Sequence, residues 1–328
     1  MCFRSACAMD GSRSVWRDPD MADHEFLTVD VFAECAFQGA PIAVFPDASA
    51  MAEELLPAIA GELNLSETLF LYPRAAPGRF GVRVFAPDGE VEPLGHPLLA
   101  AGRALLATGA VGPLGERPLP LMLDHDGGAV EVNLGPERGN RCFVQFSLSA
   151  NPVLDRYTPA RPELAALLSL PEREIDTRSF GVRLASLGRP YLIVPIFSQS
   201  AVEAARFDAD AWGSSSAPAL AAQEIFLFSG RTHSRDADFH GRLLGPDIGP
   251  REDPPIGAVM PCFAGYLADH DGIREGTYTF AIDRGRVAGR RSLLHIELDK
   301  RRGRPVQVRV GGDTVLVTRG TLHVESRR

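Results

Sequence analysis

The segment 82–106 shows the clearest change of hydrophobic pattern along the chain. An alternating apolar run at 82–85 is followed by a Pro-Asp-Gly turn, by two acids, and then by an Ala- and Leu-rich stretch that starts at Gly95. The first run favours a strand and the second a helix. Pro97 suits the first helical turn, where its missing N–H is not needed. The pattern therefore predicts a strand, an acidic loop and a helix, with His96 beside backbone N–H groups that attract anions.

A second segment, 242–267, repeats this order of features. Its Pro-Asp turn at 246–247 corresponds to the one at 87–88, and Gly257 corresponds to Gly95, again between an acidic, proline-containing loop and an apolar helix. A long internal repeat of this kind is typical of a duplicated domain. Two facing half-sites would then place a His from one half opposite an acid from the other. The alternative is a chance similarity between two strand–helix units.

The rest of the chain is patterned mainly as strands. Short alternating or β-branched runs predict strands, and three stretches with helical spacing predict outer helices. The expected strands are 26–32, 42–45, 68–72, 119–124, 129–134, 142–148, 191–197, 224–228, 277–282, 292–298, 306–310 and 314–318, and the expected helices are 51–63, 163–168 and 198–206. Gly127-Gly128 and Gly311-Gly312 are expected to form hairpin turns, the second between the last two strands. Together these elements predict an α+β fold.

The repeat divides the chain into two halves, each with one apolar helix that could run through its middle. We expect the first half at 21–150 and the second at 151–313, with the last strand, 314–328, as a candidate to complete the first half. Segment 1–20 is polar, without periodicity and without the apolar core of a signal peptide. We therefore expect a disordered extension there, with Met21 as an alternative start of translation.

Composition and charge narrow the class of protein. The 328 residues are 45% hydrophobic and 23% charged, which is a globular composition. A net charge of -8 argues against a nucleic-acid partner or an anionic membrane surface. No apolar run is long enough to span a membrane. The basic cluster at 284–304 has no interleaved aromatic residues, so we expect solvated turns there. No GxSxG, P-loop or strand–GxGxxG–helix signature is present, which argues against the common hydrolase, NTPase and dinucleotide-binding folds.

The cysteines and histidines give no metal signature. The five cysteines form no CxxC pair and have no histidine at metal-ligand spacing. This usage is typical of a reducing compartment, so we expect a cytoplasmic protein without structural zinc. The Asp-His-Asp triplets at 124–126 and 269–271 lie beside glycines in turn contexts, and we expect no metal at either.

Several short motifs occur in an order that covers nearly the whole chain from Phe26 onward. They are VDVF at 29–32, G-x-P at 39–41, AVFPD at 43–47, LNLSET at 63–68, GHP at 95–97, EDP at 252–254, GR at 289–290 and VGG at 310–312. In this order the chain resembles the PhzF (phenazine biosynthesis) family, which shares the fold of diaminopimelate epimerase. The resemblance implies two pseudo-symmetric halves, each a curled, mainly antiparallel sheet around a central helix, with the active site in the cleft between them.

The resemblance also implies the site and its chemistry. The family's SET glutamate is the catalytic acid/base, which is Glu67 here, and the His of GHP and the Asp of EDP are His96 and Asp253. The expected substrate-binding residues are Ser66, Gly95, Gly257 and Ala258. The implied reaction is an isomerisation without a cofactor, in which a proton moves between carbons of a small carboxylate-bearing substrate. Elementary chemistry agrees, because burial raises the pKa of a carboxyl toward neutrality and helix N-termini hold a carboxylate without metal. Family members often form homodimers.

Each catalytic candidate also has a simpler structural explanation. Glu67 could be a solvated residue at a strand edge, since charged side chains are mostly exposed. His96 could cap its helix, and Asp253 before Pro254 is a common turn pair. The family match and the internal repeat favour the catalytic interpretation.

The second copy departs from the family pattern more than the first. The family's GNP turn is GAP, with Ala40 for Asn, and its EDPATGSA is EDPPIGAV, with Pro255, Ile256 and Ala258 for Ala, Thr and Ser. The two lost hydroxyls remove hydrogen-bonding groups that are worth about 1–3 kcal/mol each in a buried site. A second hypothesis is therefore a binding or regulatory protein that keeps the cleft without turnover. A third, an amino-acid racemase, would need a second base on the opposite face of the substrate, and no cysteine pair is available for it.

Overall fold

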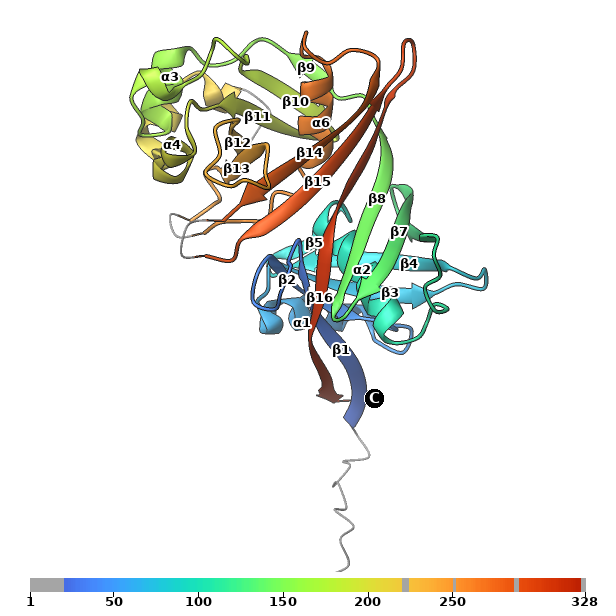
Figure 1. The fold of residues 1–328 in the computed structure, drawn as a ribbon. Helices are drawn as coiled ribbons and strands as arrows, with labels where there is room; N and C mark the ends of the chain where they lie inside the picture. Colours follow the sequence, from blue (N-terminus) through green and yellow to red (C-terminus); the bar gives the residue numbers. More distant parts are fainter. Residues whose placement is uncertain (1–20, 220–223, 250–251, 286–288, 326–328) are drawn as a thin grey trace, which may run out of the picture.

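The computed structural model describes residues 21–219, 224–249, 252–285 and 289–325. Its backbone forms two strand-rich halves, and each curls around one central helix (Figure 1). The predicted disordered extension at 1–20 lies outside the described residues. Within the described residues, no helix is long and apolar enough to cross a membrane.

The first half is a closed ring of strands around helix α2 (His96–Ala107). The ring runs in the order β1-β2-β3-β4-β6-β7-β8-β16, and β16 closes it by pairing with β1. Its strands are β1 (Met21–Val31), β2 (Ala40–Phe45), β3 (Glu67–Pro73), β4 (Arg79–Ala86), β6 (Leu119–His125), β7 (Gly128–Arg138), β8 (Arg141–Ala150) and β16 (Val306–Glu325), with β5 (Gly89–Val91) paired to β4. Ten residues of α2 are buried, because apolar side chains of the ring surround the helix.

The second half continues the same sheet from β16 and curls around helix α6 (Met260–Ala268). Its order from β16 is β15-β14-β13-β12-β11-β10-β9, so this half ends at an edge strand. The strands are β9 (Val153–Asp155), β10 (Arg183–Leu187), β11 (Arg189–Pro195), β12 (Glu224–Ser229), β13 (Phe239–Leu244), β14 (Gly276–Arg284) and β15 (Ser292–Lys300). The short helices α3 (Arg161–Leu167), α4 (Gln199–Ala204) and α5 (Ala209–Ser214) pack on its outer face through a second apolar cluster.

The two halves repeat one pattern of strand pairing. In the first half, β2 is parallel to β3 across α1 (Leu56–Leu63), and β4 is parallel to β6 across α2. In the second, β11 is parallel to β12 across α4 and α5, and β13 is parallel to β14 across α6. The other pairs are antiparallel. The predicted α+β class, with two pseudo-symmetric, mainly antiparallel halves, is therefore confirmed.

The predicted hairpin at Gly311-Gly312 is wrong. Strand β16 runs through both glycines without a turn and lies beside β8 as it passes from one half into the other (Figure 1). A Cβ on Gly311 would lie 2.6 Å from Cβ of Gln145, and one on Gly312 would lie 2.6 Å from Cδ1 of Phe32. These glycines therefore allow a close approach between neighbours, which is the other role of glycine within a strand. The two-residue turn that joins β6 to β7, next to Gly128, is a hairpin as predicted.

Smaller differences concern boundaries. The helix expected at 51–63 is a short 3-10 turn (Glu53–Leu55) followed by α1. Strand β9 lies at the start of the second half, where the sequence pattern predicts no strand. Residues 257–259 form a turn, so that α6 begins three residues after Gly257.

Candidate active site

The starts of the two central helices meet between the halves. Gly95, the residue before α2, has φ +82, and a Cβ there would lie 2.7 Å from the backbone N of Ala258 and the carbonyl carbon of Gly257. A Cβ on Gly257 would lie 3.1 Å from the backbone N of His96. Only glycine tolerates such a conformation and such a contact with backbone atoms. The structure thus brings Gly95 and His96 together with Gly257 and Ala258, a pair that lies far away in the sequence.

The two helix starts are not equivalent. Helix α2 begins directly at His96, so that its first N–H groups face the junction. In the second half, Gly257 to Val259 form a turn, and the N of Met260 is 3.4 Å from the carbonyl O of Gly257. The second half therefore offers the N–H groups of a turn where the first offers those of a helix.

Glu67 is held at the start of β3 by the way the preceding helix ends. Asn64 closes α1 in the left-handed conformation, with φ 48, and the chain then enters β3 with Glu67 paired beside Ile42 of β2. The side chain of Glu67 is 19% exposed and that of His96 is 5% exposed, and Oε2 of Glu67 lies 3.0 Å from Nε2 of His96. The contact is poorly aligned, and neither atom makes a regular hydrogen bond within the described chain. A sheltered carboxylate that keeps a free lone pair beside an imidazole is suited to proton transfer.

Asp253 faces a cation instead of a histidine. Its Oδ2 is 3.6 Å from a terminal nitrogen of Arg284, the last residue of β14. The side chain of Arg284 is 6% exposed, and its Nη1 donates to Oγ of Ser292 at 3.1 Å. Burial lowers the pKa of Arg284, and the nearby charge of Asp253 opposes this effect. The predicted solvated turns are therefore wrong for Arg284, which is a buried member of the basic cluster.

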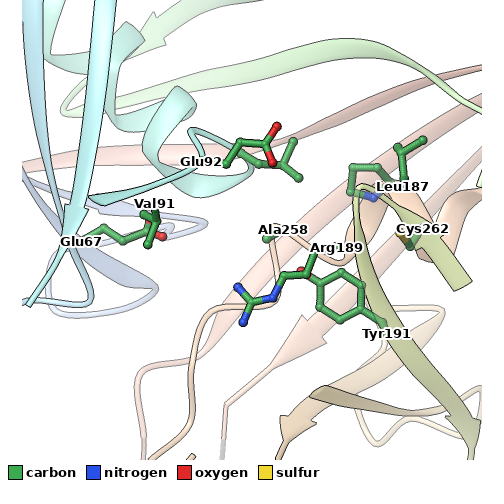
Figure 2. Close-up of a pocket in the computed structure, with 10 residues that line it drawn as sticks. Glu67, Val91, Glu92, Leu187, Arg189, Tyr191, Ala258 and Cys262 are labelled. Carbon is green, nitrogen blue, oxygen red and sulfur yellow. The ribbon is translucent and has the colours of Figure 1, made fainter. Parts of the chain in front are cut away.

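Two cavities border the start of β3. The larger, of about 690 Å³, is lined by Ser66, Asp253, Arg284 and Arg290 together with 39–41. The smaller, of about 90 Å³, is lined by residues of both halves and is the one of the two that includes a junction residue, Ala258, among its described lining. Figure 2 shows Glu67, Val91 and Glu92 on the wall from the first half and Leu187, Arg189, Tyr191, Ala258 and Cys262 on the wall from the second.

The predicted site residues are thus divided between two cavities. Ser66 and Asp253 face the larger cavity, whereas Glu67 and Ala258 face the smaller. Ser66 and Glu67 are consecutive, so the start of β3 borders both cavities. Glu67 and Asp253 line different cavities.

Three cavity residues were missed or misjudged from the sequence. Arg189 opens β11 beside the smaller cavity, and nothing in its local pattern marks it. Tyr191, on the same strand, is 2% exposed, and burial raises the pKa of its hydroxyl. Arg284 follows Phe280 and Ile282 at alternate positions of one strand, and this spacing, which indicates an inward-facing side chain, could have revealed it.

Cys262 lines the smaller cavity, but its thiol is not suited to act as a base. Burial raises the pKa of its thiol to about 11, so it stays protonated near neutral pH. A thiol acts as a base only as the thiolate. Among the described residues, no three metal-ligating side chains are grouped closely enough to hold an ion.

Comparisons with known proteins identify the family and agree with the fold. Residues 29–320 match the model of a family described as phenazine biosynthesis-like protein. The chain is 29% identical over 314 residues to an uncharacterised isomerase of Mesorhizobium japonicum, which covers 93% of this chain and 100% of the relative. It is 28% identical over 299 residues to the trans-2,3-dihydro-3-hydroxyanthranilate isomerase of Pseudomonas chlororaphis, covering 91% of this chain and 99% of the relative. A Bacillus anthracis phenazine biosynthesis protein of the PhzF family has the same fold, with a TM-score of 0.80 at 19% identity over 92% of this chain and 100% of that one.

Proposed function

The chain belongs to the phenazine biosynthesis-like (PhzF) family, and from this premise we propose that it is a cofactor-independent isomerase or epimerase. Its substrate would be a small carboxylate, and Glu67 would carry the proton. The names of its relatives, an uncharacterised isomerase and a trans-2,3-dihydro-3-hydroxyanthranilate isomerase, support isomerisation as the type of reaction. At these identities the hydroxyanthranilate is one candidate substrate among other small carboxylates.

The proposed reaction moves one proton within the substrate. The substrate carboxylate would lie at the junction of the helix starts, where backbone N–H groups around Gly95 and Gly257 stabilise negative charge. Glu67 would take a proton from the adjacent carbon, and the electron pair of that C–H bond would move into the conjugated carboxylate system. The protonated Glu67 would then return the proton to another carbon of the conjugated system, which gives the isomer. Epimerisation at the same carbon would need a proton donor on the opposite face of the substrate. His96 and Asp253 would assist by contacting polar groups of the substrate.

The observation that carries this proposal is the contact between Glu67 and His96. Their side chains meet at 3.0 Å in a sheltered place, yet Oε2 of Glu67 has no regular hydrogen-bond donor. A structural ion pair would normally satisfy such a buried oxygen. A base that must accept a proton from carbon needs a free lone pair.

Solvent deuterium uptake tests the proposal. Wild type and Glu67→Gln would be incubated in deuterated buffer with a panel of small cyclic and amino carboxylic acids, and uptake into C–H positions would be followed by NMR. We expect uptake with wild type alone, at a position next to a carboxylate. Uptake that is equal in both proteins would remove Glu67 from the reaction.

A second candidate function is binding without turnover, and one observation favours it. Ala258 stands where the family has a serine, and it lies in a turn where the first half already has a helix. If the panel gives ligand binding but no exchange with wild type, this function replaces the isomerase. A cytoplasmic location and a homodimer are further proposals, and sedimentation of the purified chain tests the dimer.

A further inference from the structure

Arg284 is a buried arginine whose donors are mostly unused. A guanidinium carries five N–H donors. In Arg284, one nitrogen donates to Oγ of Ser292 at 3.1 Å, and Nε is buried without a partner in the described chain. The acid beside it, Asp253, is 3.6 Å away, which is too long for a hydrogen bond. A buried charge with unfilled donors is costly unless a ligand fills them.

Arg290 lines the same cavity, but most of its donors already have partners. Its guanidinium donates to the carbonyl oxygens of Gly39 and Gln38 at 3.1 and 2.8 Å and pairs with Oδ1 of Asp30. It therefore joins the β1–β2 loop to the second half. Of the two arginines that line the larger cavity among the described residues, Arg284 is the one with donors left for a ligand.

The acids of this cavity leave Arg284 available. The carboxylate of Glu252 turns back to its own loop, where Oε2 accepts a hydrogen bond from the N–H of Gly249 at 3.0 Å. Asp253 faces Arg284, but its Oδ1 is buried and has no hydrogen-bond partner among the described residues. A ligand that brings acceptor oxygens to Arg284 and a hydroxyl or amino donor to Asp253 would satisfy both side chains.

The position of Arg284 separates it from the carboxylate site of the proposed reaction. Arg284 lines the cavity of about 690 Å³ together with Ser66, whose neighbour Glu67 reaches the helix junction. Ligand pockets for small molecules are usually of about 300–1,000 Å³. A substrate with one end at the junction can therefore place its other end in this cavity.

We propose that Arg284 binds a second oxyanion of the substrate, a carboxylate or phosphate separate from the carboxylate at the helix starts. The natural substrate is then a dianion, and Arg284 determines this specificity. The fork of a guanidinium matches two oxygens of either group. The inference rests on the proposed function for the role of the first carboxylate, but its test needs no turnover.

Calorimetric binding of three probes tests the inference: succinate, inorganic phosphate and the monocarboxylate butyrate. The proteins are wild type, Arg284→Gln and the control Arg79→Gln, which removes an exposed arginine that is paired with Asp124 outside both cavities. We expect wild type and Arg79→Gln to bind succinate or phosphate at least about ten-fold more tightly than Arg284→Gln does, with butyrate unchanged. Loss of succinate binding identifies a carboxylate as the second group, and loss of phosphate binding alone identifies a phosphate.

Two results overturn the inference: wild type binds succinate and phosphate no better than butyrate, or folded Arg284→Gln binds them as wild type does. Cooperative thermal unfolding checks that Arg284→Gln is folded. If it is not folded, Arg284→Lys takes its place, because lysine keeps the charge but lacks the planar pair of donors. Arg284→Lys is expected to weaken the binding of succinate several-fold, and unchanged binding rejects the inference. The same titration on Glu67→Gln separates the two proposals, because that variant should lose deuterium exchange and keep Arg284-dependent binding.

Discussion

The duplicated halves place a glutamate at the same point of the fold and give it different surroundings. Glu67 opens β3 and Glu224 opens β12, and each of these strands is parallel to the strand before it. Glu67 meets His96 at 3.0 Å without a regular hydrogen bond, whereas Glu224 pairs with Arg189 at 3.0 Å. The fold thus supplies two candidate bases, and the neighbour of each decides its use. A carboxylate that accepts a hydrogen bond from arginine has that lone pair occupied, whereas one that faces an imidazole without a regular hydrogen bond keeps a lone pair for a proton.

The same contrast holds at the helix starts. The residue after Gly95 is His96, and the residue after Gly257 is Ala258. The first half therefore carries the proposed proton transfer, while the second half supplies Asp253, Arg284 and Arg189, which are suited to hold polar groups of a substrate. We infer that, after the duplication, the first half supplies the proton-transferring residue and the second half supplies most of the charged residues that bind the substrate.

The largest expected effect separates the two glutamates. Glu67→Gln should lower the rate of substrate-dependent deuterium exchange about 10²- to 10⁴-fold, because positioned general bases contribute this much. Glu224→Gln, at the matching strand position, should retain exchange within a few-fold. Exchange rates measured by NMR under identical conditions check both variants. Equal losses in the two would mean that the halves share the chemistry.

The next effect concerns the junction of the halves. Gly95→Ala should lower the free energy of unfolding by about 3 kcal/mol, because the new Cβ would meet backbone atoms of Ala258 and Gly257 at a φ that suits glycine. Gly109→Ala is the matched control: its φ is also positive, at +71, but nothing lies within 4 Å of the added Cβ. It should cost about 1 kcal/mol. Denaturant unfolding measures both, and a difference near zero would show that the helix starts can separate without cost.

The sequence predicts the features that repeat or alternate, and it fails where one residue serves two purposes. The strand–loop–helix repeat around Gly95 and Gly257 predicts two halves, because the pattern depends on local propensity and on burial. Gly311 and Gly312 mislead, since a Gly-Gly pair suits a turn and also a close contact between strands. The choice depends on Phe32, which lies far away in the sequence and packs against Gly312.

The site shows the same limit. The motifs mark Glu67, His96 and Asp253, but they give no sign that Glu67 and Asp253 line different cavities. Arg284 lies among other basic residues, so its burial is hidden by composition and visible only in the alternation of its strand. Residues that become neighbours only in the folded chain have no fixed spacing in the sequence, so a local pattern cannot reveal them.

A smaller effect is expected from giving the second helix start a hydroxyl. Ala258→Ser should raise the rate of deuterium exchange by about ten-fold, because one added hydrogen bond to an ionised group is worth at least about 1.5 kcal/mol. Ala264→Ser, at a buried position of α6 away from both cavities, is the control for the effect of the hydroxyl itself. An unchanged rate in Ala258→Ser, or an equal rise in the control, would show that a hydroxyl at position 258 does not contact the substrate.

The smallest expected effect concerns how the free energy of unfolding depends on pH, which should reveal the buried carboxyl of Glu224. Burial raises the pKa of Glu224 above its usual value, and Arg189 opposes this only in part. The folded chain therefore keeps the proton of Glu224 to a higher pH than the unfolded chain does, so stability falls as pH rises from the ordinary glutamate pKa through the raised one. Below that window both states are protonated and the penalty is absent. Glu224→Gln should flatten this part of the curve of stability against pH, as measured by denaturant unfolding in steps of pH, whereas Glu62→Gln, on the exposed face of α1, should leave it unchanged. An unaltered slope in Glu224→Gln would mean that the pair with Arg189 fully offsets burial, and that the two glutamates differ by partner alone.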